Sequence, residues 1–423
     1  MKRFTLVLPV ALLVLVVAVG SWSMACGPTT PPVDGFHFTI TADMRGYHIK
    51  FGDLLQAINY GPGPGVFHVS IGDIDNTIPE NRAQIDDKFG ITAVWYPIIG
   101  NHEAETPSDM DWLRTEYNTG HSDRTALEFN TNQDGPIGSV GTTYSWDYGN
   151  AHFIALNQYW DGGTTLGSDN ATDGDIVPAL YNWLATDLTA NTKPFVFVFG
   201  HEPAFPYNRH VGDSLDKYVA NRDAFWSLLE AEDVQAFFCG HTHYYSKHQG
   251  DKSHVGGVWQ LDVGNAGNDP GDGLTYFDVV VGSNQATVNV YRDGGTGIFS
   301  LVESVKLLFW ESYSDSEHNI HCDNFSDYST EHVAYMYGTG FTANHSYKVA
   351  YYDGSGNNSA TETVISDTSG DLSSHHTFID EIDIAGTWHV IVCDVVHNPP
   401  STYNATWTNT LLDDSFTVQE SAI

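Results

Sequence analysis

Residues 195–201, Phe-Val-Phe-Val-Phe-Gly-His, and residues 234–243, Val-Gln-Ala-Phe-Phe-Cys-Gly-His-Thr-His, decide the fold of this chain. In both stretches a run of β-branched and aromatic residues, which favours a strand, ends at a glycine and a histidine. Residues 66–73 end in the same way at Gly-Asp, and residues 93–103 end at Gly-Asn-His-Glu. Carboxylate, amide and imidazole groups bind hard and borderline metal ions, so four such strand ends predict a metal-binding cluster.

Strands and helices alternate from Phe36 to about Lys306, which predicts a layered α/β domain with its ligands on loops at the C-terminal ends of strands. From residue 312 onward, short strands are separated by Gly, Asp, Asn and Ser turns. That pattern predicts a second, all-β sandwich domain over residues 312–423, Ig-like in the loose sense. The predicted helices of the first domain are 51–60, 79–89, 109–117, 177–188 and 221–232.

The first 25 residues are typical of a secretory signal peptide. Lys2 and Arg3 precede an apolar run, and Ser23-Met24-Ala25 forms a small-residue cleavage site. Cys26 follows that site directly and resembles the lipidated cysteine of a bacterial lipoprotein, with residues 26–35 as a linker. We therefore expect an exported protein, either extracellular or held at the cell surface by a lipid anchor at Cys26.

The charge balance restricts the partners. The chain has 17 Lys and Arg against 53 Asp and Glu, a formal net charge of −36. Such a surface repels polyanions, so nucleic acid is not an expected partner. Oligomeric state cannot be inferred from the sequence.

Four cysteines are present, and their spacing does not indicate a metal cluster. Cys239 lies in a predicted strand, where it is expected to be a small buried residue. Cys322 and Cys393 both fall in the C-terminal segment. In an exported protein they form either a disulfide or two free thiols.

The ordered blocks resemble one known family. Asp43 is followed by Gly-Asp-x-x-Asn at 72–76, Gly-Asn-His-Glu at 100–103, Gly-His-Glu at 200–202 and Gly-His-Thr-His at 240–243. This order resembles the calcineurin-like metallophosphoesterase superfamily over residues 36–306, and the last two blocks are similar to its purple acid phosphatase branch. The resemblance implies a four-layer αββα sandwich of two mixed sheets, with a two-metal site at the apex of the loops.

The resemblance also implies which residues bind two divalent or trivalent ions, with Fe, Mn and Zn all suited to the ligands. Asp73 would bridge the two metals. The first metal would also be held by Asp43 and His243, with the Asn76 carbonyl as a fourth ligand. The second would be held by Asn101, His201 and His241.

Three further residues are candidates for catalysis. By the resemblance, His102 faces the substrate, and His210 is either substrate-facing or a solvated loop histidine. Arg45 stands where most of the family has a metal-binding histidine. Arginine cannot coordinate a metal, so Arg45 either grips phosphate bidentately or pairs with a surface carboxylate. His48 is a candidate replacement ligand.

Together these features predict a hydrolase acting on phosphoric ester bonds. The expected substrate is a small phosphomonoester or phosphodiester, attacked by a metal-bridging hydroxide as the resemblance implies. Two alternatives remain: a degenerate, non-catalytic phosphate- or metal-binding protein of the cell surface, and a surface interaction protein in which the β-sandwich dominates. The residues do not indicate which ester or which metals are used.

Overall fold

The computed structural model describes residues 35–418 with internal gaps. The predicted signal peptide, Cys26, nearly all of the predicted linker, Asn76 and Cys322 lie outside the described residues. The gaps are 76–77, 119–133, 166, 168, 170–172, 250–257, 268–272, 283–285, 308, 314–323, 326–331, 369, 379–385 and 405–410.

The first sheet has six strands in the order β12-β11-β10-β1-β2-β3. Strands β1, β2 and β3 run parallel to one another, whereas β10 pairs antiparallel with β1, β11 with β10, and β12 with β11. The sheet is therefore mixed. Its strands are β1 (Phe36–Thr41), β2 (His68–Ile71), β3 (Trp95–Ile98), β10 (Thr275–Val281), β11 (Ala286–Arg292) and β12 (Ser300–Leu307).

The second sheet also has six strands, in the order β4-β5-β6-β7-β9-β8. The four central strands are parallel, and β4 and β8 pair antiparallel at the two edges. Its strands are β4 (Tyr144–Tyr148), β5 (Ala151–Ala155), β6 (Phe195–Phe199), β7 (Ala236–Cys239), β8 (Tyr245–Gln249) and β9 (Trp259–Val263).

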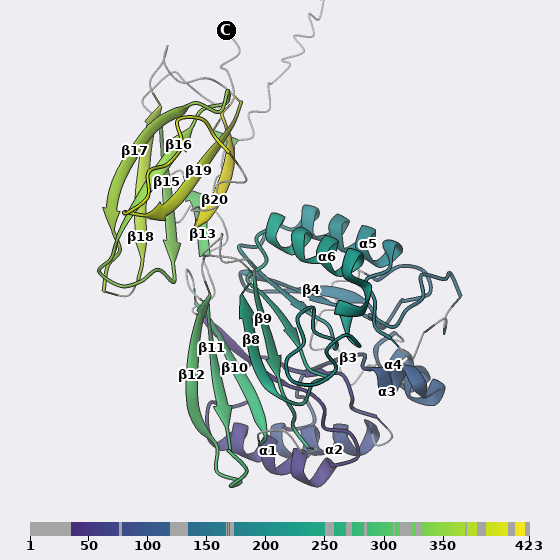
Figure 1. The fold of residues 1–423 in the computed structure, drawn as a ribbon. Helices are drawn as coiled ribbons and strands as arrows, with labels where there is room; N and C mark the ends of the chain where they lie inside the picture. Colours follow the sequence, from purple (N-terminus) through teal and green to yellow (C-terminus); the bar gives the residue numbers. More distant parts are fainter. Residues whose placement is uncertain are drawn as a thin grey trace, which may run out of the picture.

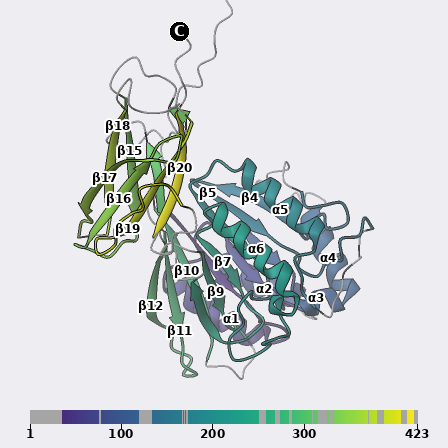
Figure 2. The same cartoon turned by 45° about the horizontal axis from the view of Figure 1, so that its top comes forward.

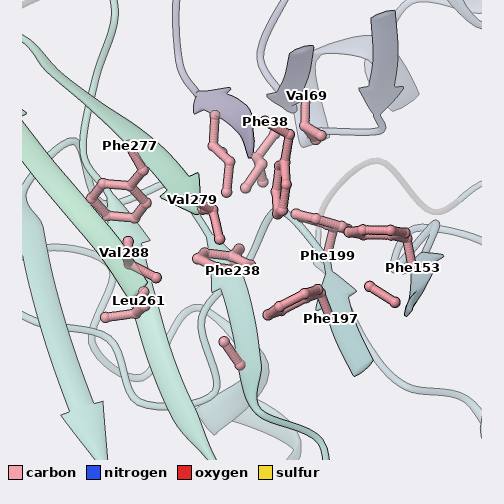
Figure 3. Packing of buried hydrophobic residues seen from close by; sticks show 14 of the residues in the cluster. Phe38, Val69, Phe153, Phe197, Phe199, Phe238, Leu261, Phe277, Val279 and Val288 are labelled. Carbon is pink, nitrogen blue, oxygen red and sulfur yellow. The ribbon is translucent and has the colours of Figure 1, made fainter. Parts of the chain in front are cut away.

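The two sheets pack face to face over an aromatic core. In β6 the phenylalanines at 195, 197 and 199 point into this core, while Val196 and Val198 point to the opposite face of the sheet. This alternation follows from the period of two along a strand, and it explains why β6 is apolar at every position. Figure 3 shows Phe197 and Phe199 beside Phe153, with Phe38 and Val69 of the first sheet across from them.

Helices cover both outer faces. Helices α1 (His48–Tyr60) and α2 (Ile78–Phe89) pack on the first sheet, and α5 (Pro178–Ala190) and α6 (Val219–Ala231) pack on the second. The two pairs lie on opposite sides of the sheets in both views (Figures 1 and 2). The predicted α/β fold of two mixed sheets flanked by helices is confirmed. Among the described residues, no helix has both the length and the apolar character to cross a membrane.

The remaining strands, seen at the green and yellow end of Figure 1, build a separate β-rich region. A sheet in the order β13-β15-β18 and one in the order β14-β20-β19-β16-β17 both contribute residues to one buried cluster, and the identity of the region as an Ig-like β-sandwich stays a prediction. Strand β12 of the first sheet ends at Leu307, and β13 of the β-rich region begins at Phe309. The strands are β13 (Phe309–Tyr313), β14 (Asn324–Phe325), β15 (His332–Thr339), β16 (Ser346–Tyr352), β17 (Asn358–Ile365), β18 (Leu372–Phe378), β19 (Gly386–Asp394) and β20 (Leu412–Val418).

The cysteine predictions have different outcomes. Cys239 is buried in β7, as expected. Cys393 is also buried, and it forms no disulfide with any described residue. Its predicted partner Cys322 lies outside the described residues. The Cys322–Cys393 pairing stays a prediction.

Candidate metal centre

The loops that follow five strands bring the predicted ligands together. Asp43, Asp73 and Asn101 follow the parallel strands β1, β2 and β3 of the first sheet. His201 follows β6 of the second sheet, and His241 and His243 follow β7. The C-terminal ends of parallel strands meet at one edge of a sheet, which is where ligands bind in α/β folds.

Asp43 and Asp73 form the acidic centre of this cluster. Ligand atoms of Asp43, Asp73 and His201 all lie within 4.8 Å of one another, and all three residues are buried. His201 Nε2 is 3.3 Å from Asp73 Oδ1 and 3.9 Å from Asp43 Oδ1. His243 Nε2 is 3.3 Å from Asp43 Oδ1. Each of the two carboxylates thus has an imidazole beside it, and the four groups are close enough to share bound cations.

His241 and His210 extend the cluster. The backbone N–H of His241 donates to Asp43 Oδ2 at 2.9 Å, and its ring lies 5.0 Å from that of His201. The ring of His210 stacks on His241 with the centroids 4.0 Å apart. Burial, together with the neighbouring His201 and His210, holds the pKa of His241 well below its ordinary value. Its imidazole is neutral at neutral pH and has a lone pair available for a metal.

Several buried atoms of the cluster lack hydrogen-bond partners. Among the described residues, Asp43 Oδ1, Asn101 Oδ1 and His201 Nε2 make no hydrogen bond, although Asp43 Oδ1 and His201 Nε2 each lie 3.3 Å from a group of opposite charge type. Buried polar atoms are nearly always paired, so such a group of oxygens and nitrogen calls for an explanation. All three are potential metal ligands, and cations between them would satisfy them. The donor set of carboxylate, amide and neutral imidazole fits Fe, Mn or Zn.

The orientation of His201 fits a ligand role. Its Nδ1–H donates to the carbonyl of Ile71 at 2.9 Å, so the proton resides on Nδ1 and Nε2 faces Asp73 and Asp43. In metal-binding histidines, a hydrogen bond from the ring N–H that does not face the metal commonly fixes the tautomer. Burial favours the neutral acid of Asp43, but His243 and His201 outweigh it and hold the pKa of Asp43 below its usual value.

The backbone around the cluster is strained. Asp43, Asp73, His241 and His243 have φ of 56°, 51°, 69° and 62°, a left-handed conformation that costs free energy for residues other than glycine. Gly72 shares it at 68°, and a Cβ there would lie 2.3 Å from Nδ1 of His201. Only glycine therefore lets the loop after β2 pass this close to His201. Strain of this kind concentrates at functional sites.

Glu103 is a residue of the cluster that sequence reasoning did not single out. Its Oε2 accepts from the backbone N–H groups of Gly100 and Asp73 at 2.8 and 2.9 Å, and its Oε1 accepts from Ile74 at 2.7 Å. The buried carboxylate therefore joins the loop after β3 to the loop after β2. The signal was a glutamate three residues after Gly100, the position of a helix N-terminal capping partner.

Glu202 was also not assigned a role. It accepts from the Tyr159 hydroxyl and from the Gly174 N–H, both at 2.9 Å. Burial raises the pKa of Glu202 to about 7. The side chain ties the segment after β5 to the loop that carries His201.

Arg45 lies beside the cluster rather than alone on the surface. Its Nε donates to Asp75 Oδ1 at 3.1 Å and its Nη2 donates to Asp75 Oδ2 at 3.5 Å. The same Nη2 is 3.3 Å from His102 Nδ1, and His102 Nε2 is 3.7 Å from Asp73 Oδ2. The sequence left two roles open for Arg45, a bidentate contact to phosphate and an ion pair with a surface carboxylate. The structure contains an ion pair, but its carboxylate, Asp75, is buried.

The remaining candidates are placed as follows. Asn76 lies outside the described residues, so its predicted carbonyl ligand stays a prediction. His48 begins helix α1 and is not part of the carboxylate–histidine group.

A family model for calcineurin-like phosphoesterases matches residues 36–245, a segment that contains the candidate ligands Asp43, Asp73, Asn101, His201, His241 and His243. Among solved structures, the chain is similar to a dimetal phosphatase from Danio rerio, with 15% identity, 65% of this chain and 99% of that chain covered, and a TM-score of 0.46. It is also similar to a putative 5′-nucleotidase from Staphylococcus aureus, with 13% identity, 64% and 53% covered, and a TM-score of 0.36. A phosphoesterase from E. coli gives 12% identity, 64% and 98% covered, and a TM-score of 0.25. No curated protein matches the chain.

Proposed function

We propose that this chain, whose residues 36–245 belong to the calcineurin-like metallophosphoesterase superfamily, hydrolyses small phosphomonoesters or phosphodiesters with two bound metal ions. The observation that carries the proposal is the set of buried, unpartnered ligand atoms on Asp43, Asn101 and His201, which lie on loops from both sheets. Without metal ions these atoms would stay buried without a hydrogen bond, and a buried polar group left without one costs about 1–3 kcal/mol.

The pairings within the cluster support a division of the ligands. Asp43 lies against His243, and Asp73 lies against His201. We assign Asp43 and His243 to one ion, with the Asn76 carbonyl, and Asn101, His201 and His241 to the other, with Asp73 between them. When bound, two such ions supply Lewis-acid chemistry, lowering the pKa of water and neutralising charge on the phosphoryl oxygens.

Two side chains of the protein are assigned to the substrate. His102 Nε2 stands 3.7 Å from Asp73 Oδ2, whereas His201 faces the other oxygen of Asp73, and His102 can donate to a phosphoryl or leaving oxygen. His210 stacks on His241 and is partly exposed, so one face of its ring is held while its edge can meet a substrate. Both side chains are partly exposed beside the cluster, which supports their contact with a phosphoester.

The location and the finer family are further proposals. The sequence of residues 1–26 supports export and a lipid anchor at Cys26, so the substrate is met outside the cytoplasm. The spacing of the blocks around His201 and His241 supports the purple acid phosphatase branch. The strongly acidic chain supports a small phosphoester rather than nucleic acid as substrate.

The test is hydrolysis of p-nitrophenyl phosphate and bis-p-nitrophenyl phosphate before and after exhaustive chelation. We expect chelation to abolish activity toward at least one ester, and Mn²⁺, Zn²⁺ or iron to restore it. Activity that survives chelation would overturn the two-metal mechanism. Metal-loaded protein that hydrolyses neither ester would instead favour a non-catalytic phosphate- or metal-binding protein.

A further inference from the structure

Arg45 is held more firmly than a surface arginine. Asn81 Nδ2 donates to the carbonyl of Arg45 at 2.8 Å and to that of Ile74 at 2.9 Å. The backbone N–H of Arg45 donates to the Asp73 carbonyl at 2.8 Å. These bonds hold Arg45 at a left-handed φ of 44°, which an arginine does not adopt without support. The loop after β1 is thereby fixed to the loop after β2.

The side chain of Arg45 is fixed as well. Asp75, whose side chain is 6% exposed, accepts from both Nε and Nη2. Burial opposes the charge on Arg45, but the hydrogen bond and charge of Asp75 outweigh it and raise the pKa of Arg45. The guanidinium is always protonated and has donors only. Because Asp75 holds the planar guanidinium in one orientation, Nη2–H points toward Nδ1 of His102.

We propose that Arg45, clamped by Asp75, is a positioning residue that makes Nδ1 of His102 a hydrogen-bond acceptor and thereby directs Nε2–H of His102 toward the metal cluster. The inference deepens the proposed function and rests on it for the role of His102 toward substrate. A neutral imidazole that accepts at Nδ1 must have its proton on Nε2. That nitrogen lies on the Asp73 side, where a phosphoryl oxygen would be met.

Two carboxylates also face Nδ1 of His102. Asp75 Oδ2 is 3.9 Å away but is already engaged by Nη2 of Arg45, and Glu105 is the nearer of the two. Its Oε2 is 3.3 Å from His102 Nδ1, and a carboxylate there would favour a proton on Nδ1. Glu105 is 50% exposed, however, and is therefore screened by water. Arg45, by contrast, is held in place by the buried carboxylate of Asp75. Its Nη2–H donor is therefore pre-organised, and we expect it to outweigh Glu105 at Nδ1 of His102. Glu105→Gln is consequently the matched control for variants of Arg45.

The tautomer can be read without any metal or substrate. Long-range ¹⁵N–¹H spectra of metal-free, ¹⁵N-histidine-labelled protein at about pH 8.5 distinguish the two neutral tautomers, and His102→Gln identifies the signal of His102. We expect the Nε2–H form in the wild type and in Glu105→Gln, and a mixture or the Nδ1–H form in Arg45→Gln and Asp75→Asn. The Nδ1–H form in the wild type would overturn the proposal, whether or not the protein hydrolyses phosphoesters.

Kinetics then separate positioning from direct phosphate contact. We expect Arg45→Gln to lower kcat about tenfold or more with little change in KM or metal content, because it acts through a single hydrogen-bonding histidine. In the His102→Gln background the same change should alter kcat less than about twofold, since residues that act through one another are non-additive. A raised KM with kcat retained, or fully additive losses, would instead show that Arg45 contacts the phosphate itself. Arg292→Gln, on β11, controls for an arginine replacement elsewhere.

Discussion

At the residue scale, Glu103 fixes the position of the Asp73 backbone. Asp73 sits in a strained left-handed conformation, and its own N–H is held by Glu103 together with those of Gly100 and Ile74. One buried carboxylate thus satisfies three backbone donors of two loops. Burial and the neighbouring Asp73 raise the pKa of Glu103, and the three hydrogen bonds to its oxygens offset part of the cost of the strained backbone.

Glu103→Gln should therefore destabilise the metal-free protein. The amide group must turn its NH₂ toward at least one of the three N–H donors, which leaves that donor buried and unpaired. We expect the free energy of unfolding in urea to fall by about 1–3 kcal/mol. Glu232→Gln, at the end of α6, replaces a glutamate outside the site and should change it by less than about 0.5 kcal/mol. Equal stability of both variants would show that Glu103 does not hold the loops.

That the candidate ligands lie close together could be predicted from the sequence because each follows a segment with strand character; that they bind metal stays a prediction. Asp43, Asp73, His201 and His243 come together as the strand ends predict. The supporting partners could not be predicted in the same way. The pairing of Arg45 with Asp75 crosses 30 positions of the chain, and it depends on the relative placement of two loops rather than on any local pattern.

At the element scale, His152 joins helix α5 to the hairpin of β4 and β5. Its Nδ1 is 2.6 Å from Asp147 Oδ1, and its Nε2 is 3.0 Å from Asp187 Oδ2 on α5. Ser145 donates to the other oxygen of Asp187 at 3.0 Å. Burial opposes the imidazolium, but the hydrogen bonds to Asp147 and Asp187 outweigh it and raise the pKa of His152 to about 9.

This pKa makes the stability depend on pH in a defined window. The folded-state pKa is raised above the unfolded value of about 6.5, so the stabilisation is complete below about pH 6.5. It declines as the pH rises and is absent above about pH 9. The shift corresponds to a contribution on the order of 3 kcal/mol. We expect the difference in melting temperature between wild type and His152→Gln to shrink from pH 6.5 to pH 9.5. A difference independent of pH would contradict a charged His152.

The elements that the sequence predicts are those with a strong period. The expected strand at 195–199 and the expected helix at 79–89 are observed as β6 and as α2, Ile78–Phe89. Helix α3, Asn101–Glu105, escapes prediction because five residues are too few to show a helical period. Strand β12 has mostly exposed side chains at its start, so the apolar alternation that marks a half-buried strand is missing there.

At the scale of the whole molecule, the order of the strands was beyond sequence reasoning. Strand β10 pairs with β1 although more than 200 residues separate them in the chain, as the register of Phe38 with Val279 shows. Such long-range pairing depends on which face of each strand is buried in the aromatic core between the two sheets. A local sequence pattern does not encode it. The sequence does show a change of pattern, from alternating strands and helices up to about Lys306 to short strands from residue 312, but the domain boundary drawn from it stays a prediction.

The central claim is that loops from two sheets build a site for two metal ions. Isothermal titration of chelated, full-length protein with Mn²⁺ tests it most directly. The account predicts about two ions per chain for the wild type and for Asp223→Ala, an exposed aspartate on α6, and a loss of at least one ion for Asp73→Ala. A wild type that binds no metal, or an Asp73→Ala variant that binds as the wild type does, would contradict it.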